Sequence, residues 1–179
     1  KKLGFTAVWV TPLVVQQKPT SGGAGYHGYW GVDFLNVDPH LGTNGDLTAL
    51  KECADKLGLK LILDVVTNHT GDIIWYDERK AYIPEKYRDI KNPAWLNDIN
   101  NYHNTGDMNR CWSDGPCTKN GDFFGLDDIA TENPVVYNGW ADVYGKWIKD
   151  YGLSGFRVDT ARHVDDNFFK NWSPQIDSA

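Results

Sequence analysis

Two short segments of the chain contain residue types that can carry out acid–base or nucleophilic chemistry. Residues 64–69 read Asp-Val-Val-Thr-Asn-His, and residues 157–163 read Arg-Val-Asp-Thr-Ala-Arg-His. Arg157 and Asp159 are two residues apart, so in a strand they lie on one face, where the guanidinium would keep the carboxylate ionised. Glycoside hydrolysis uses such a carboxylate beside a second, protonated carboxyl group. A structural ion pair is the alternative interpretation.

A local pattern that occurs three times predicts the elements that position these segments. A glycine precedes a short β-branched or aromatic run in residues 3–10, 57–66 and 151–159. Each run is typical of a helix that ends at a left-handed glycine and is followed by a buried strand. The second and third runs are almost continuously apolar, which predicts parallel strands covered on both faces. Active sites of parallel α/β proteins lie at the strand C-termini, where the polar residues follow.

Helices are predicted between these strands. Residues 46–56 form one amphipathic helix, and a second begins at Asn133 and Pro134, which are suited to the N-cap and the first helical position. The expected apolar stripes are Leu47, Leu50, Ala54 and Leu57 in the first helix and Val136, Trp140, Val143, Trp147 and Tyr151 in the second. Residues 71–126 have no sustained period and are too long for an ordinary connection, which predicts an inserted subdomain.

Composition limits the class of protein. The chain has 179 residues, a net charge of -6, 41% hydrophobic residues and 13% aromatic residues, which fits one globular domain and suits a sugar-binding cleft. The absence of a basic block argues against a nucleic-acid partner. No apolar run reaches the roughly 18 residues of a membrane helix, and residues 1–4 lack the long apolar stretch of a signal peptide. A doubly wound sheet and part of a (β/α)8 barrel, which needs about 250 residues, both fit.

Three cysteines cannot all pair within the chain. Cys111 and Cys117 lie close together in a loop-like stretch, which is compatible with a short disulfide and weakly favours an exported protein. Cys53 lies among helix formers, and we expect it to be a small buried hydrophobic residue.

Both chemical segments resemble signature blocks of the α-amylase family of glycoside hydrolases. Residues 25–33 are similar to the loop after an earlier barrel strand of that family, and residues 126–129 to the block that closes its inserted domain. The resemblance implies an α/β fold, a partial (β/α)8 TIM barrel with a small irregular insertion. The implied domains are residues 1–70 with barrel strands two and three, 71–126 as the inserted B domain, and 127–179 as the barrel continuation with strand four.

The resemblance also implies roles for single residues. Asp159 matches the nucleophile, which forms a covalent glycosyl-enzyme, and Arg157 would keep it ionised. Tyr29 matches the aromatic residue that stacks under the sugar ring, and His69 matches a histidine that hydrogen-bonds that sugar.

Further substrate contacts are expected from the same blocks, with a hydrogen-bonded wall or a surface helix as the alternative. They are His27 and Trp30 beside Tyr29, Asp64 at a strand end, and Arg162 and His163 after the nucleophile. Asp64 is expected to hold Arg157 or the floor of the cleft.

A structural calcium ion is implied by the family. Asn68 and Asp128 match side-chain ligands, and His163 would supply its backbone carbonyl, an all-oxygen set that suits Ca2+. Ala130 departs from the polar residue that many members carry two positions after Asp128. Asp114 is a candidate for a further ligand.

The implied activity is retaining hydrolysis of α-1,4-glucosidic bonds in starch-like glucans. The family's general acid and second aspartate follow later strands and have no place here, so we expect the isolated chain to be inactive or nearly so. Transglycosidases, isomerases and non-catalytic glucan-binding or partner subunits of the same family are the alternatives. Open sheet edges predict self-association, and a secreted or periplasmic location is expected for the full-length protein.

Overall fold

A three-stranded parallel sheet organises the protein. The computed structural model describes residues 1–20, 22–78, 80–108, 111, 113 and 115–179. The sheet has the order β1 (Ala7–Val10), β4 (Lys60–Val66), β7 (Gly155–Asp159), and all pairs are parallel. The register sets Asp64 opposite Arg157. The three predicted strands are therefore confirmed.

The glycine before each strand ends the preceding turn or helix in the way the sequence predicts. Gly58 has φ +62° and follows the last turn of α1 (Asn44–Lys56), and Gly152 has φ +60° at the C-cap of α3 (Pro134–Tyr151). A side chain with a Cβ strains in this conformation, whereas glycine does not.

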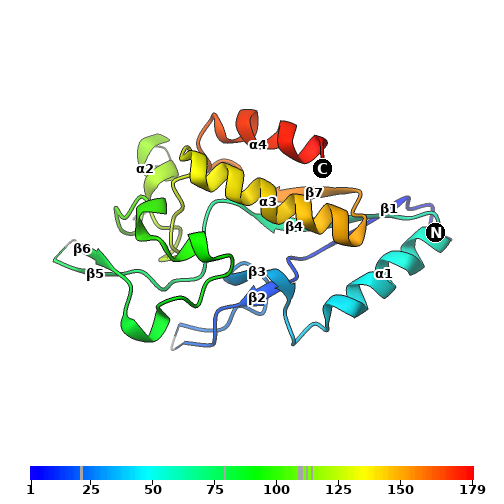
Figure 1. The fold of residues 1–179 in the computed structure, drawn as a ribbon, viewed down its shortest axis with the longest axis horizontal. Helices are drawn as coiled ribbons and strands as arrows, with labels where there is room; N and C mark the ends of the chain where they lie inside the picture. The colour runs from blue at the N-terminus through cyan, green and yellow to red at the C-terminus, as the bar shows by residue number, and fades with distance from the viewer. Residues whose placement is uncertain (21, 79, 109–110, 112, 114) are drawn as a thin grey trace.

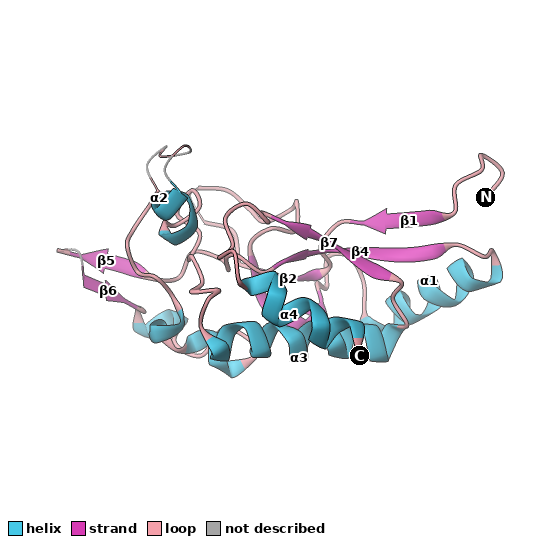
Figure 2. Ribbon diagram, turned by 90° about the horizontal axis from the view of Figure 1, so that it is seen from above, coloured by secondary structure: helices cyan, strands magenta, loops and turns pink. Residues whose placement is uncertain are grey.

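Helices α1, α3 and α4 (Phe168–Asp177) all lie on one side of the sheet, as Figure 2 shows. A doubly wound sheet would have helices on both sides, so this arrangement is that of a barrel wall. The sheet does not close into a barrel within the described residues. The prediction that β7 is covered on both faces is wrong, because β7 is an edge strand and all five of its residues are only half-buried.

The helix termini follow from local hydrogen bonding. Thr43 and Asp46 form a capping box at the start of α1, and the Asn133 side chain accepts from the amide of Val135 at the start of α3. Two predictions about the first helix are wrong. Leu50 and Leu57 are exposed, and so is Cys53, because among the described elements α1 contacts β3, β4 and α3 through a narrower face than its apolar pattern indicates.

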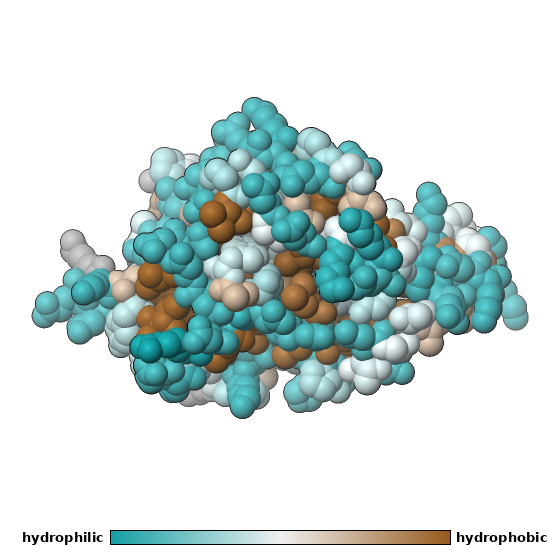
Figure 3. All heavy atoms as spheres, viewed as in Figure 1, coloured by the Kyte–Doolittle hydropathy of each residue, from teal (hydrophilic) through white to brown (hydrophobic). Residues whose placement is uncertain are grey.

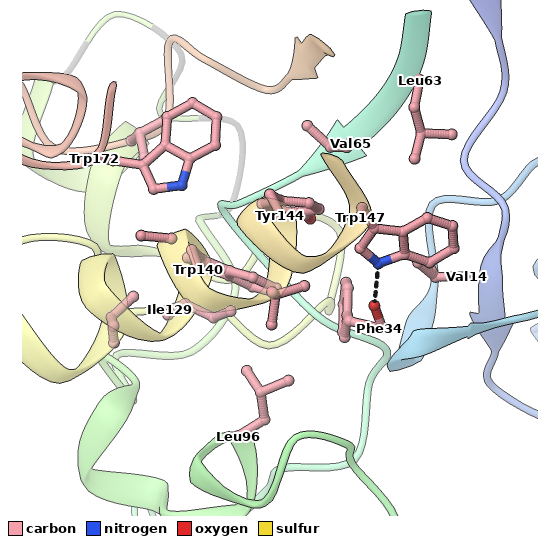
Figure 4. Close-up of a cluster of buried hydrophobic side chains, with 14 of the residues drawn as sticks. Val14, Phe34, Leu63, Val65, Leu96, Ile129, Trp140, Tyr144, Trp147 and Trp172 are labelled. Carbon is pink, nitrogen blue, oxygen red and sulfur yellow. Dashed lines mark hydrogen bonds between the residues drawn. The ribbon is translucent and has the colours of Figure 1, made fainter. Parts of the chain in front are cut away.

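Aromatic residues of α3 fill the core between the helices and the sheet (Figure 4). Trp140, Tyr144 and Trp147 are buried, and the indole of Trp147 donates a 2.7 Å hydrogen bond to the carbonyl of Phe34. Trp140 also packs edge-to-face against Phe34, with ring centroids 4.8 Å apart. Buried polar tips of this kind need partners, so the Trp147 contact fixes β3 against α3.

An antiparallel hairpin that the sequence analysis did not predict precedes α1. It pairs β2 (Val14–Gln16) with β3 (Gly31–Val37), and register shifts interrupt the pairing. The long loop between these two strands contains His27, Tyr29 and Trp30. This loop lies at the carboxyl ends of β4 and β7, where the contacts described below hold it.

Residues 71–126 form short elements, as the lack of a sequence period predicts. They are β5 (Trp75–Asp77), β6 (Lys80–Tyr82), three 3-10 turns and α2 (Gly115–Asn120). The turns are η1 (Glu85–Tyr87), η2 (Ala94–Asn97) and η3 (Ile99–Asn101). The β5–β6 hairpin extends at the end of the molecule opposite the N-terminus (Figure 1). The three domain boundaries stay predictions.

A buried ion pair links this segment to the barrel part. Lys91 Nζ lies 2.6 Å from Asp127 Oδ2 and 3.0 Å from the Tyr102 hydroxyl, and both charged side chains are 0% exposed. The Asp127 carboxylate also accepts the backbone amides of Ile73 and Ile74. Every charge in this pair is therefore matched by a partner.

One further feature agrees with the sequence-based expectations. Cys111 and Cys117 form a disulfide. Among the described residues, no helix is long and apolar enough to cross a membrane. The outer face that carries α3 is mostly hydrophilic, with small apolar areas between the polar side chains (Figure 3).

Candidate active site

Asp64 is the centre of a polar cluster at the carboxyl ends of β4 and β7. Its side chain is buried, and its Oδ2 accepts hydrogen bonds from the Tyr29 hydroxyl at 3.0 Å and the Trp9 indole at 3.2 Å. Arg157 Nη1 lies 3.2 Å from Oδ1 and 3.1 Å from Oδ2 of the same carboxylate. Asp64 therefore fixes three side chains that come from β1, β7 and the loop before β3.

Arg157 is shared between two carboxylates. Its Nη1 also donates to Oδ1 of Asp159, so the two residues that are neighbours on one face of β7 are in direct contact. The guanidinium lies over the Trp9 ring, with Cζ 5.3 Å from the ring centroid. The Arg157 side chain is 41% exposed and that of Asp159 is 20% exposed, so a ligand can reach this end of the cluster.

Burial and neighbouring charge change how the cluster titrates. Burial raises the pKa of Asp64, while the hydrogen bonds from Arg157 and Tyr29 oppose that change. Burial and the adjacent Asp64 carboxylate raise the pKa of the Tyr29 phenol, which therefore stays protonated and donates. Asp64 thus acts as the acceptor that holds the donors around it.

The loop before β3 brings His27, Tyr29 and Trp30 to the cluster. The Tyr29 amide donates to His27 Nδ1 at 3.1 Å, and these two rings stack with centroids 5.6 Å apart. The Trp30 ring packs edge-on against His27 at 5.3 Å. Gly28 permits this turn, because it has φ +92° and a Cβ there would meet the Pro12 carbonyl at 2.7 Å.

His69 lies behind this loop and is only 1% exposed. Its Nε2 is 3.2 Å from the Tyr29 carbonyl, so Nε2 carries the hydrogen, and its ring stacks on Phe123 with centroids 5.6 Å apart. Burial lowers the pKa of His69 to about 4, which keeps the ring neutral. In this arrangement the ring supports Tyr29 from behind, and its expected contact with a sugar stays a prediction.

Arg162 and His163 separate after the chain leaves β7. Thr160 has φ +50°, and its carbonyl accepts the His163 amide at 2.8 Å, which makes a tight turn directly after Asp159. Arg162 is exposed and lines a hollow of about 310 Å³ together with Lys119 and Asp166. His163 is buried, and its Nδ1 lies 2.9 Å from the Thr118 carbonyl. The turn therefore directs one side chain outward and the other toward α2.

The residues expected to bind calcium are partly brought together. Asn68 Nδ2 donates to Asp128 Oδ1 at 3.2 Å, and the buried Asn68 Oδ1 has no hydrogen-bond partner among the described residues. Within that part of the chain, no three His, Cys, Asp or Glu residues are arranged as a metal site. Asp114 lies outside the described residues. The unsatisfied amide oxygen beside a carboxylate fits a hard cation, which prefers oxygen ligands.

His103 adds a contact that the sequence analysis missed. His103 Nδ1 lies 2.5 Å from Asp128 Oδ2, and its Nε2 lies 3.2 Å from the Glu132 carboxylate. Burial would lower the pKa of His103, but the hydrogen bonds that its ring donates to these carboxylates raise it to about 9. The imidazolium therefore holds the second oxygen of Asp128.

Trp9 and Phe123 were also missed as site residues. Trp9 is near the end of β1, and its partner Asp64 is 55 positions away in sequence, so only the parallel register of β1 and β4 brings them together. Phe123 belongs to the irregular segment and stacks on His69. It also lies edge-to-face with His163, with ring centroids 4.7 Å apart. The position of Trp9 at a strand end was a usable signal, whereas Phe123 offered none.

Comparisons with known proteins identify the family of this chain. Residues 1–176 match the family model described as alpha amylase, catalytic domain. An α-amylase of Streptomyces lividans is 36% identical over 99% of this chain and 24% of its own length. A cyclomaltodextrin glucanotransferase of Klebsiella oxytoca is 33% identical over 98% of this chain and 27% of its own. A periplasmic α-amylase of Escherichia coli is 29% identical over 92% of this chain and 34% of its own.

A solved structure is similar over the same region. The α-amylase of Geobacillus thermoleovorans in complex with acarbose superposes with a TM-score of 0.77 and 37% identity, over 99% of this chain and 35% of that one. The chain therefore spans about a quarter to a third of the length of these four proteins. From the family model, the relatives and the barrel-wall fold together, we conclude that this chain belongs to the α-amylase catalytic-domain family of glycoside hydrolases.

Proposed function

We propose that this chain carries the nucleophile half of the active site of an enzyme that hydrolyses α-1,4-glucosidic bonds with retention. The observation that carries the proposal is the guanidinium of Arg157 held between Asp64 and Asp159 at the carboxyl end of the parallel sheet. A positive group in this position pairs directly with the Asp159 carboxylate at the accessible side of the cluster. Asp64 and Trp9 fix the guanidinium from behind.

In the first step, an oxygen of Asp159 forms a bond to the anomeric carbon while the bond from that carbon to the glycosidic oxygen breaks. The departing oxygen takes a proton from a general acid. In the second step, water adds its oxygen to the anomeric carbon, Asp159 leaves, and the proton of the water passes to the conjugate base of the same acid. Tyr29, half-buried beside Asp64, would stack under the sugar ring.

The general acid must come from outside this cluster. Asp64 is a second carboxyl group close to Asp159, and burial raises its pKa, which is a property of catalytic acids. However, Asp64 is 1% exposed, and its oxygens already accept from Trp9, Tyr29 and Arg157. It can neither reach a glycosidic oxygen nor release its donors. We therefore assign Asp64 to holding Arg157, and the acid to later strands of a longer polypeptide.

We also propose that Asn68 and Asp128 hold a structural Ca2+, with the His163 carbonyl as a third oxygen. The buried, unpartnered Asn68 Oδ1 next to Asp128 supports this assignment. A bound cation would link the segment after β4, the residues that follow the inserted segment and the turn after β7, and so would stabilise the walls around Asp159. The ion has no part in the proposed bond-making steps.

The test is reducing-sugar release from soluble starch and maltoheptaose. We expect no release from the 179-residue chain, and release from a polypeptide extended through the remaining barrel strands. Asp159→Asn in the extended polypeptide should abolish release, whereas Asp142→Asn, on the outer side of α3, should not. Release by the chain alone would contradict the half-site proposal. Glucan binding without release by the extended polypeptide would favour a non-catalytic relative.

Transglycosylation is a second candidate reaction, because cyclomaltodextrin glucanotransferases are among the relatives at similar identity. The same Asp159 intermediate would then pass its glycosyl group to a sugar hydroxyl in place of water. Product analysis on maltoheptaose separates the two reactions. Shorter linear sugars indicate hydrolysis, and longer or cyclic sugars indicate transfer.

We place the full-length protein outside the cytoplasm. The Cys111 to Cys117 disulfide supports this location, because such bonds persist in oxidising compartments.

A further inference from the structure

The outer face of the β5–β6 hairpin carries an exposed aromatic group. In the antiparallel register, Trp75 faces Tyr82 and Asp77 faces Lys80, so these four residues share one face of the hairpin. The Trp75 and Tyr82 rings lie edge-to-face with centroids 6.5 Å apart, and they are 40% and 41% exposed. We call these four residues the hairpin face.

A second element fixes the orientation of Trp75. Tyr87, in η1, packs edge-on against Trp75 at 6.0 Å. Lys86 Nζ lies 4.8 Å from the Trp75 centroid and 4.6 Å from the Tyr87 centroid. A ring held by two neighbours loses little freedom when a ligand binds, which favours binding.

We propose that the hairpin face is a surface binding site for an α-glucan chain, separate from the Asp159 cluster. This inference rests on the proposed function, because it takes the same substrate class. Its ligand is the non-reacting part of a long glucan.

The composition of the face favours a sugar over a protein partner. Cores of protein interfaces are depleted of charged residues, whereas here Asp77 and Lys80 lie directly beside the rings. A pyranose offers C–H groups to an aromatic face and pairs of hydroxyls to a carboxylate and an ammonium group. Rings and opposite charges on one small face supply both kinds of contact.

Packing within the hairpin and against η1 covers only part of the Trp75 and Tyr82 rings, which stay 40% and 41% exposed. An isolated two-stranded hairpin is only marginally stable, and its apolar side chains gain stability when they are buried. On this hairpin the anchoring contact comes from Tyr76 on the opposite face, whose hydroxyl donates to Asp122 at 2.8 Å. Tyr76 is 36% exposed, and Trp75 and Tyr82 are slightly more exposed, at the end of the molecule where the hairpin extends (Figure 1).

The opposite face of the hairpin is linked through Tyr76 to the wall of the candidate active site. Asp122, which binds Tyr76, immediately precedes Phe123, and Phe123 stacks on His69. A long glucan held on the hairpin face would therefore lie on the same subdomain as the cleft. Two linked contacts raise the effective concentration of a polymer at the second site, whereas a short sugar gains nothing.

The experiment measures adsorption of the extended polypeptide to granular starch, with its hydrolysis of maltotriose as the second readout. We expect Trp75→Ala and Tyr82→Ala each to weaken adsorption about tenfold, as the loss of one stacked ring would. Maltotriose hydrolysis should stay within about twofold of the unmodified protein, since this sugar is too short to use both sites. Phe5→Ala is the matched control, because Phe5 is a 66% exposed ring outside the hairpin.

Trp75→Phe tests whether Trp75→Ala acts by removing the ring. It keeps a stacking ring in the hairpin, so it should retain most of the adsorption. Asp159→Asn should lose hydrolysis yet adsorb normally. If the Trp75 and Tyr82 variants adsorb like the Phe5 control, the surface site is overturned and the proposed function stands. If Asp159→Asn still hydrolyses maltotriose, the proposed function fails, and adsorption still decides the surface site.

Discussion

Two charged clusters in this protein differ in how far their side chains are exposed to solvent. Where the inserted segment joins the barrel part, Lys91 and Asp127 are 0% exposed; Lys91 bonds Asp127 and Tyr102, and Asp127 also accepts two backbone amides. At the strand ends, Arg157 is shared between Asp64 and Asp159 and remains 41% exposed. Burial and the nearby Tyr102 and Asp127 oppose each other at Lys91, with the result that its pKa is raised and its ammonium group stays charged.

This difference in exposure distinguishes a charged pair that stabilises the fold from one that can react with a ligand. A fully buried, fully partnered ion pair has no capacity left for a ligand, so its role is to fix the chain around it. In the strand-end cluster, Asp64 has that holding role and Asp159 lies at the accessible side. Chemistry is therefore expected only where a partnered charge meets an open surface.

The largest effect is expected from breaking the buried pair. Lys91→Met leaves the Asp127 carboxylate buried without its ammonium partner, which should lower the free energy of unfolding by about 3 to 5 kcal/mol. Replacing both charges, as in Lys91→Met with Asp127→Asn, keeps a side-chain oxygen for the Ile73 and Ile74 amides and should recover part of that loss. Urea unfolding monitored by tryptophan fluorescence measures both variants. Equal losses for the single and double variants would show that the charges are not what matters.

Arg157→Met tests the other cluster through activity. Removing the shared guanidinium should lower kcat/KM of the extended polypeptide by about 10²- to 10³-fold, the size of a lost electrostatic contact in an active site. Arg88→Met is the control, because Arg88 pairs only with the exposed Glu85 in the described contacts of its turn. A loss below threefold for Arg157→Met would remove the observation on which the proposed function rests.

Calcium should stabilise the chain by a smaller amount. At 100 times its dissociation constant, an ion that binds only the folded state contributes about 2.7 kcal/mol. We expect CaCl2 to raise the urea midpoint, and a chelator to reverse the effect. Asp128→Asn should reduce the response, whereas Asp98→Asn, at an exposed turn, should leave it unchanged. An undiminished response in Asp128→Asn would place the ion elsewhere.

Tyr29→Phe should have the smallest effect. It removes one donor to Asp64 and keeps the ring, which should cost about 1 kcal/mol of unfolding free energy. It should also raise the pKa of Asp64 further, since that hydrogen bond opposes the effect of burial. A folded-state pKa above the unfolded value makes the folded state the tighter proton binder, so stability falls as pH rises through that interval. Urea midpoints from pH 4 to 7 should show a steeper fall in Tyr29→Phe.

The sequence predicted the central sheet better than its surroundings. The glycine-led runs identified all three parallel strands, and Asn133 with Pro134 identified the start of α3. These signals are local, because a left-handed glycine or an N-cap acts within one turn. The β2–β3 hairpin was not predicted, since its strands are separated by a long loop and register shifts interrupt their pairing.

Burial was harder to predict than secondary structure. The apolar stripe of the first helix indicated that Leu50 and Leu57 are covered, yet both are exposed. Periodicity states which side of a helix is apolar, whereas only the neighbouring elements decide how wide the covered face is. The same reason explains Cys53, which the local sequence indicated as buried and the structure exposes.

By itself, the sequence determined the residues that resemble the family's blocks, the strands that carry them, and the shared face of Arg157 and Asp159. Spacing along one strand fixes that face, because side chains alternate every two residues. Only the tertiary structure decided that Asp64 binds the guanidinium of Arg157, which is 93 positions away in sequence. It likewise decided that Trp9 and Phe123 belong to the candidate active site. It also decided that Lys91 pairs with Asp127 and that Trp75 remains exposed, since these depend on contacts between distant segments.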